Sequence, residues 1–129
     1  MEAKSVVRTE KAPAPFQGAP YSQAIRAGGF VFVSGQVALA PGSSEIVGDT
    51  IQEQTEQVFA NLRAILEASG SGLDRLVKTT VFLVDFGDFQ AMNEVYARHV
   101  GATPPARATV EVGSMPSGAL VEIDAIAQL

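Results

Sequence analysis

The chain has no cysteine, no tryptophan and a single histidine, His99, among its 129 residues. Without cysteine it can form no disulfide, no thiolate nucleophile, no iron–sulfur cluster and no zinc site built on thiolates. One histidine is also too few for a histidine-rich metal site, so any bound metal would need carboxylate ligands. The available chemistry therefore rests on carboxyl, hydroxyl and guanidinium groups.

Charged residues are scarce as well, at 18% of the chain against about 25% in a typical soluble domain. The deficit is concentrated between Ala12 and Ser44, where Arg26 is the only charged residue. Hydrophobic residues already reach 47% before the 12 glycines are counted. Because a domain of this length buries only about two thirds of its unfolded surface, we expect something beyond its own core to cover the surplus.

Membranes and nucleic acids are poor candidates for that covering partner. The uncharged stretch from Ala27 to Ser44 contains several glycines and Pro41, so it cannot form the apolar helix of about 20 residues that spans a bilayer. The first residues, Met-Glu-Ala-Lys-Ser, lack the apolar core of a signal peptide, and we expect a cytoplasmic protein. The net charge of -5 argues against binding nucleic acid, although the 9 Lys and Arg residues could still form a local basic patch.

Hydrophobic periodicity predicts a single domain over residues 1–129 with two helices and several strands. The sequence Thr50-Ile51-Gln52-Glu53 has the form of a capping box, and it starts a predicted helix over 51–69 that Gly70 ends. A second helix carries Phe89, Met92, Val95, Tyr96 and His99 on one face and ends before Gly101. The predicted strands are Val6–Thr9, Ile25–Ala27, Phe30–Val33 with a continuation through Gln36 to Leu39, Leu76–Val84, Ala106–Val112 and Leu120–Ala127.

This order of elements indicates an α+β fold in which two helices pack on one face of a single sheet. The opposite face, rich in Val, Ile and Phe, is left without a cover inside the chain. A surface of that kind is typical of a protein interface, so we predict an obligate homo-oligomer.

The last two strands place three polar residues at alternating positions. If Ala106–Val112 and Leu120–Ala127 form an antiparallel hairpin, matching their polar faces sets Thr109 opposite Glu122 and Arg107 on the diagonal. A guanidinium, a hydroxyl and a carboxylate would then share one patch.

Each candidate also has a simpler interpretation. Arg107 is either a solvated charge or a clamp for a ligand carboxylate, and Glu122 is either a solvent-facing residue or a general acid and base. Asp85 and Asp88 could ligate Mg²⁺, but aspartate just before a helix usually caps it. His99 is expected to be packed or half exposed on its helix.

Six short motifs occur in an order and at separations typical of one family. They are Ala19-Pro20-Tyr21-Ser22-Gln23-Ala24, Phe32-Val33-Ser34-Gly35-Gln36, Gln54-Thr55 through Asn61-Leu62 to Gly70, Asn93-Glu94-Val95-Tyr96, Pro105-Ala106-Arg107 and Val121-Glu122-Ile123. On these motifs the sequence, from about Ala12 to Ala127, resembles the RidA (reactive intermediate deaminase A) family of small proteins that hydrolyse 2-imino acids.

The resemblance implies a chorismate-mutase-like fold assembled as a homotrimer around a central barrel, with active sites between subunits and no metal or cofactor. By this resemblance, Arg107 binds the substrate carboxylate and Glu122 positions or activates water. The residues that would line the cleft are Tyr21, Ser34, Gly35, Asn93 and Thr109. Three positions depart from the family pattern: Thr109 stands where many relatives carry Cys, Ala19 replaces a frequent Gly, and Met115 replaces Leu.

The implied reaction converts 2-iminopropanoate and 2-iminobutanoate to 2-keto acids and ammonia. Two alternatives stay open. The same cleft could bind a keto or imino acid without turnover, although a pure carboxylate sensor would need Arg107 but not Glu122. Ribonuclease activity, suggested for some relatives, fits poorly with a pI near 4.7.

Overall fold

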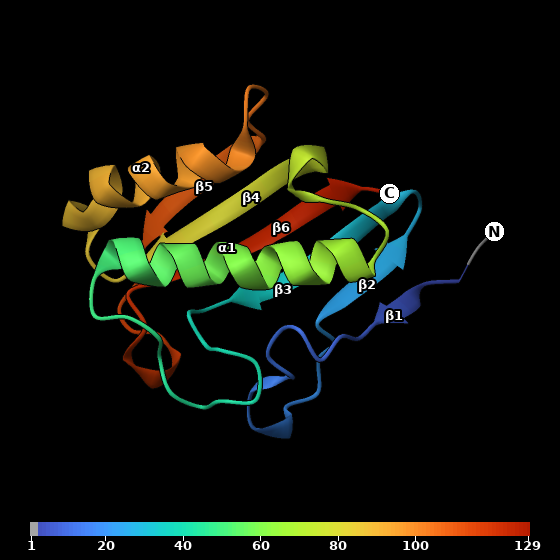
Figure 1. The fold of residues 1–129 in the computed structure, drawn as a ribbon, viewed down its shortest axis with the longest axis horizontal. Coiled ribbons are helices and arrows are strands. Elements are labelled where there is room, and N and C mark those ends of the chain that lie inside the picture. Colours follow the sequence, from blue (N-terminus) through green and yellow to red (C-terminus); the bar gives the residue numbers. More distant parts are fainter. Residues whose placement is uncertain (1–2) are drawn as a thin grey trace.

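A computed structural model describes residues 3–129 as one mixed sheet with two helices (Figure 1). The predicted order of strands and helices is confirmed, with small shifts at the ends. The elements are β1 (Ser5–Val7), β2 (Ala24–Ala27), β3 (Phe30–Gln36), α1 (Ile51–Ala68), β4 (Leu76–Leu83), α2 (Phe89–Val100), β5 (Ala106–Glu111) and β6 (Val121–Gln128). The expected continuation of β3 to Leu39 is reduced to an isolated bridge between Leu39 and Ile46.

The strands follow the order β1-β2-β3-β6-β4-β5 across the sheet. Neighbouring strands are antiparallel except β4 and β5, which are parallel and are connected by α2. Parallel neighbours need such a crossover, because the chain must return to the same end of the sheet before the second strand begins. The predicted hairpin between the last two strands is therefore wrong: β4 lies between β5 and β6.

Helix α1 begins and ends where its capping residues indicate. At the start of α1, the Glu53 backbone N–H donates to Thr50 Oγ1 at 3.1 Å, and the Thr50 N–H donates to Glu53 Oε1 at 3.2 Å. This confirms the capping box. The helix ends at Ala68, one residue earlier than predicted, and Gly70 follows with a φ of 86°.

The two helices cover the same face of the sheet, as Figure 1 shows. Between them and the sheet lies a core of fully buried side chains, including Phe59, Leu62, Val81, Met92 and Ile123. The other face is uncovered, as the sequence predicted. On it lie Phe32 of β3, which is 44% exposed, and Val110 of β5, which is 42% exposed.

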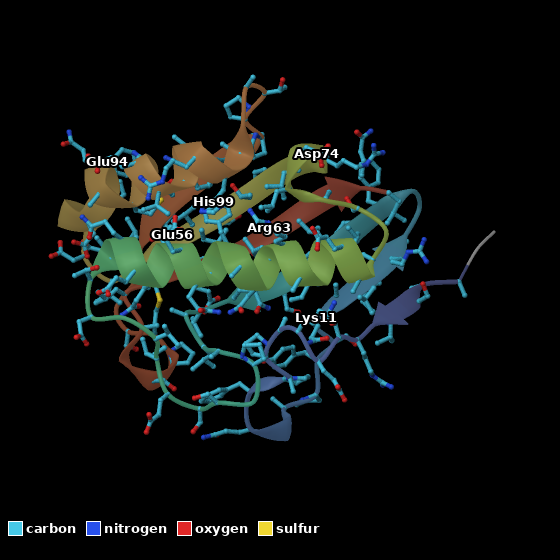
Figure 2. All side chains as sticks on the ribbon, viewed as in Figure 1. Lys11, Glu56, Arg63, Asp74, Glu94 and His99 are labelled. Carbon is cyan, nitrogen blue, oxygen red and sulfur yellow. The ribbon has the colours of Figure 1, made fainter. Side chains whose placement is uncertain are left out.

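Charged side chains gather on the outer sides of the helices, where Glu56 of α1 and His99 of α2 point toward each other (Figure 2). His99 Nε2 lies 2.9 Å from Glu56 Oε1, and the imidazole stacks on the Phe59 ring at 4.6 Å. The histidine is thus packed against the helix pair, as expected. In the part of the chain from residue 3 onward, neither helix is both long and apolar enough to cross a bilayer.

Candidate active site

The first part of the candidate site is the Glu122 carboxyl on β6. Glu122 pairs with Phe82 of β4, and its neighbours in the strand, Val121 and Ile123, point into the core. Because side chains alternate along a strand, Glu122 faces the uncovered side of the sheet.

Gly35 of β3 is the residue that lets the Glu122 carboxyl lie close against the β3 backbone. A Cβ built on Gly35 would overlap a Glu122 carboxylate oxygen and lie 2.9 Å from its Cδ. The pairing of β3 with β6 is also irregular between Val33 and Gln36, which places Gly35 in a bulge. A glycine is therefore required here for close approach, and bulges of this kind often lie beside active sites.

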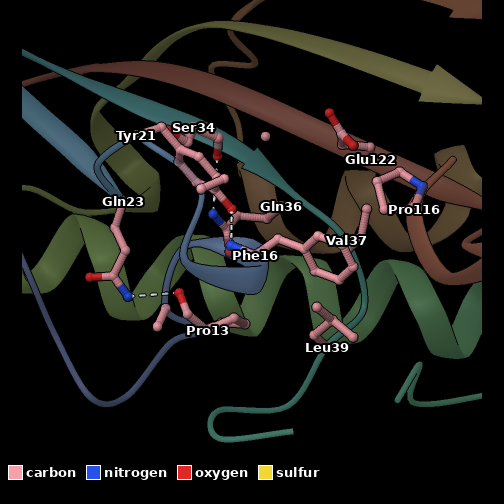
Figure 3. A pocket seen from close by; sticks show the side chains of 13 residues that line it. Pro13, Phe16, Tyr21, Gln23, Ser34, Gln36, Val37, Leu39, Pro116 and Glu122 are labelled. Atoms are coloured by element: carbon pink, nitrogen blue, oxygen red, sulfur yellow. Dashed lines mark hydrogen bonds between the residues drawn. The ribbon is translucent and has the colours of Figure 1, made fainter. Parts of the chain in front are cut away.

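Glu122 and Gly35 line a cavity of about 420 Å³ at the end of β3 (Figure 3). The predicted residues Tyr21 and Ser34 line it as well, so the structure brings four of the seven candidates together. The remaining lining comes mainly from apolar residues, including Phe16, Val37, Leu39 and Pro116. Among the described residues that line the cavity, Glu122 is the only charged one.

Hydrogen bonds fix the loop that carries Tyr21. The Ser34 hydroxyl donates to the Ser22 carbonyl at 2.6 Å, and the Phe16 backbone N–H donates to Tyr21 Oη at 2.5 Å. The buried side chain of Gln23 donates to the carbonyls of Thr9 and Pro13 and accepts from the Thr9 N–H at 2.8 Å. The sequence predicted no role for Gln23, although it lies within the Pro-Tyr-Ser-Gln motif, because its hydrogen-bond partners are at least 10 residues away along the chain.

The environment of Glu122 perturbs its ionisation. Burial raises the pKa of this carboxyl above its ordinary value, and the nearby negative charge of Asp124 raises it further. The carboxyl therefore keeps its proton to a higher pH than a solvated glutamate does. A raised pKa makes the carboxyl a better proton acceptor when it is ionised and lets it hold a proton to donate over a wider pH range, which suits acid–base catalysis.

The second part of the candidate site is Arg107 on β5. Arg107 pairs with Thr79 of β4, a fully buried residue on the helix-covered side of the sheet. Its guanidinium carbon lies 4.7 Å from the centre of the Tyr96 ring and 5.5 Å from that of Phe89, both on α2. Within residues 3–129 no acceptor is hydrogen-bonded to the guanidinium, so its N–H groups are available to an anion.

The two other candidates belong to the Arg107 side. Thr109 pairs with the buried Val81 and so faces the same side of the sheet as Arg107. Asn93 follows Phe89 by one helical turn and therefore shares its face of α2. Its Oδ1 is buried and has no hydrogen-bond partner among the described residues.

The prediction that Arg107, Thr109 and Glu122 share one patch is therefore wrong within a single chain. Val81 of β4 pairs with both Thr109 and Ile123, and this register places Thr109 on the side opposite Glu122. Arg107 and Glu122 consequently lie on opposite faces of the sheet. The error follows from the assumed hairpin, because inserting β4 removes the pairing that would have aligned the two polar faces.

Of the two aspartates before α2, Asp85 caps a turn with its side chain, whereas the Asp88 side chain makes no capping hydrogen bond. Asp85 Oδ1 accepts the Gly87 N–H at 2.8 Å, which confirms that Asp85 caps a turn. Burial, with the negative charge of Asp85, raises the pKa of Asp88. In the described part of the chain, no group of three or more His, Asp or Glu side chains is arranged to hold a metal ion.

Solved structures define the class to which this fold belongs. RidA from the Antarctic bacterium Psychrobacter superimposes with a TM-score of 0.91 at 40% identity, covering 97% of this chain and 99% of that one. E. coli TdcF, solved with bound serine, superimposes with a TM-score of 0.88 at 36% identity, covering 97% and 98% of the two chains. The mixed sheet of six strands with two helices on one face is thus the Rid fold.

Residues 9–129 match the model of the family described as Endoribonuclease L-PSP, and the chain belongs to that family. A RutC family protein of Pyrococcus abyssi is 50% identical over 125 residues, which cover 97% of each chain. The mouse protein named 2-iminobutanoate/2-iminopropanoate deaminase is 42% identical and covers 96% of this chain and 90% of its own. Arabidopsis Reactive Intermediate Deaminase A is 47% identical, covering 98% of this chain and 66% of its own. The resemblance to the RidA family is confirmed.

Proposed function

We propose that this protein hydrolyses 2-imino acids, with 2-iminopropanoate and 2-iminobutanoate as its substrates, to 2-keto acids and ammonia. The observation that carries the proposal is the Glu122 carboxyl, whose raised pKa and place in an otherwise uncharged cavity suit it to proton transfer. The mouse relative is named as a deaminase of these two imino acids and the Arabidopsis relative as a deaminase of a reactive intermediate, and both names support the same reaction.

Arg107 supplies the complementary function of binding the substrate carboxylate. A guanidinium offers a planar fork of N–H donors that matches a carboxylate in two parallel hydrogen bonds. Among the described residues, this fork lies over two aromatic rings of α2 and has no hydrogen-bonded acceptor. A substrate with a carboxylate next to its C=N carbon would therefore be held at a defined distance from any group that activates water.

Because Arg107 and Glu122 lie on opposite faces of the sheet, one chain alone does not bring them to one substrate. We infer that the site is completed between copies of the chain, in a homotrimer in which the β5 edge of one subunit, which carries Arg107, meets the uncovered sheet face of the next. Exposed apolar side chains such as Phe32, at 44% exposure, support this arrangement. The scarcity of charge between Ala12 and Ser44 is then explained by burial against a neighbouring subunit.

In the proposed reaction, Glu122 accepts a proton from water as the water oxygen attacks the C=N carbon. Glu122 passes that proton to the imine nitrogen, giving a tetrahedral carbinolamine with both OH and NH₂ on that carbon. Glu122 then accepts the proton of the new OH group as the C=O bond forms and returns it to the nitrogen, so that the C–N bond breaks and ammonia leaves. Each turnover consumes one water and needs no oxidant, metal or covalent intermediate. Positioned acid–base help of this kind contributes about 10²- to 10⁴-fold.

The test follows 2-keto acid formation from imine generated freshly in the assay, over the spontaneous rate measured without protein. Wild-type protein should accelerate the reaction, Glu122→Gln should abolish the acceleration, and Arg107→Ala should do the same by losing the substrate. Arg63→Ala, which alters an arginine on the outer face of α1, is the matched control and should behave as the wild type. Full activity in Arg107→Ala would refute the site assignment.

Two outcomes would favour other functions. A wild-type protein that binds 2-oxobutanoate tightly but gives no acceleration would be a carboxylate-binding module rather than an enzyme. RNA cleavage by the purified protein that disappears in Glu122→Gln would instead favour the endoribonuclease activity in the family's description. The net charge of -5 weighs against this second outcome.

A further inference from the structure

Arg107 is held by ring faces rather than by hydrogen bonds. The Tyr96 ring centre lies 4.7 Å from the guanidinium carbon, and Phe89 contributes a second ring at 5.5 Å. A cation over an aromatic face is attracted by the ring quadrupole, and this attraction needs no hydrogen-bond acceptor. Contact with the rings therefore restrains the group while its N–H donors stay available for a carboxylate.

Tyr96 is itself fixed from two sides. Its hydroxyl lies 2.7 Å from Thr79 Oγ1 in a buried hydrogen bond, and its ring forms a T-shaped pair with the Phe59 ring, with centres 5.4 Å apart and planes at 80°. Thr79 is fully buried on β4 and is the strand partner of Arg107. The same pair of strands thus carries the arginine and anchors the ring above it, so the ring cannot rotate away without breaking a buried hydrogen bond.

Phe89 is placed less firmly. It is the first residue of α2, it is only partly buried, and its ring stacks on the exposed Phe86 at 4.9 Å. Of the two rings, Tyr96 is therefore both the closer to the guanidinium and the more rigidly held.

We propose that Tyr96 is a positioning residue, whose ring holds the Arg107 guanidinium in the orientation that receives the substrate carboxylate. This rests on the proposed function, because the carboxylate is that of the 2-imino acid. Without the ring, Arg107 would keep its charge but sample several rotamers, and each binding event would have to restore one of them. The ring acts through Arg107 and not on the reacting carbon, so its loss weakens binding and spares the chemical step.

Two substitutions separate the ring from the hydroxyl. Tyr96→Phe keeps the ring and removes the bond to Thr79, whereas Tyr96→Leu removes the ring and keeps an apolar side chain. With 2-oxobutanoate as probe, we expect Tyr96→Leu to raise the Kd about tenfold, as loss of one partly desolvated cation–π contact implies. In the imine assay the KM should rise by a similar factor with kcat nearly unchanged. Tyr96→Phe should stay within about threefold of the wild type in both measurements.

Leu66→Ala is the matched control for general loss of packing. It truncates a fully buried side chain of α1 in the same core, and Leu66 stands further along the helix than Phe59, the α1 residue whose ring contacts Tyr96. Its thermal midpoint should fall, while its Kd for 2-oxobutanoate should stay close to that of the wild type. If Leu66→Ala weakened binding as much as Tyr96→Leu does, the effect would be one of stability, and the proposal would be wrong.

A measurement without substrate keeps the proposal separate from the proposed function. The Arg107 Nε–H resonance, assigned by its absence in Arg107→Ala, should be displaced by the ring current in the wild type and in Tyr96→Phe, and should move in Tyr96→Leu. A wild type that neither binds the keto acid nor turns over the imine would refute the proposed function alone. A resonance that stays in place in Tyr96→Leu, or an unchanged Kd in that variant, would overturn the positioning role.

Discussion

Replacing Gly35 with alanine should disable the protein without unfolding it. A Cβ at this position would overlap a Glu122 carboxylate oxygen and lie 2.9 Å from Cδ and 3.2 Å from Cγ. All three are atoms of the outer part of a flexible side chain, so Glu122 can relieve the overlap by rotating away. The carboxyl group would then leave the position beside β3 from which we propose that it activates water.

The expected effects on stability and on activity differ widely. Removing a glycine lowers the entropy of the unfolded chain and stabilises by about 0.4–1 kcal/mol, and this offsets part of the cost of moving Glu122. We therefore expect the free energy of unfolding to change by no more than about 1 kcal/mol. The acceleration of imine hydrolysis should fall by about 10²-fold or more, toward the rate of Glu122→Gln, because the acid–base contribution is lost.

The measurement pairs urea unfolding with the imine assay, and Gly113→Ala is the control. A Cβ on Gly113 would meet nothing within 4 Å, so this variant makes the same chemical change at a site without a close neighbour. It should keep full activity. If Gly35→Ala is as active as the wild type and equally stable, then the position of the Glu122 carboxyl beside β3 does not matter, and the reasoning fails.

Three further predictions concern pH, assembly and the cavity wall. The raised pKa of Glu122 means that the folded protein holds the carboxyl proton more tightly than the unfolded chain does. The protonated carboxyl therefore stabilises the folded protein at acid pH, and this stabilisation is lost as pH rises through the folded pKa. The thermal midpoint of Glu122→Gln should accordingly exceed that of the wild type at pH 8 and match it at pH 4. Phe32→Asp places a charge on the uncovered sheet face and should convert a trimer into monomers in sedimentation velocity. The control Val47→Asp changes a 39% exposed position outside the strands and should sediment as the wild type does. A wild type that sediments as a monomer at micromolar concentration would refute the proposed assembly. Asn61→Ala should lower the free energy of unfolding in urea by about 2–3 kcal/mol, because the buried Asn61 amide donates to the carbonyls of Val37 and Leu39 at 3.1 and 2.8 Å. A decrease below about 0.5 kcal/mol would show that those carbonyls find other partners.

Local signals in the sequence were sufficient for the secondary structure and for one long-range property. The capping box at Thr50 and the glycine at position 70 place the ends of α1 within one residue. These signals depend only on residues a few positions apart, which is why they can be recognised without a fold. The uncovered sheet face also followed from the sequence, because two amphipathic helices can cover only one side of a sheet.

Strand order is the property that local reasoning predicted wrongly. Alternating polarity shows which residues of β5 share a face, but it does not show which strand lies beside them. The parallel pairing of β4 with β5 depends on α2 packing back across the sheet, a contact between distant parts of the chain. This single difference in strand order caused the wrong prediction that Arg107 and Glu122 share one face of the sheet.

By itself, then, the sequence determined the elements, the two faces of the sheet and the family, since periodicity, capping and short motifs are written in neighbouring residues. Only the tertiary structure decided that Arg107 and Glu122 lie on opposite faces, that Gly35 admits the Glu122 carboxyl, and that Tyr96 lies over the guanidinium. Each of these depends on strand register or on packing between segments far apart in the chain. Burial, and with it the raised pKa of Glu122, likewise exists only once those segments have come together.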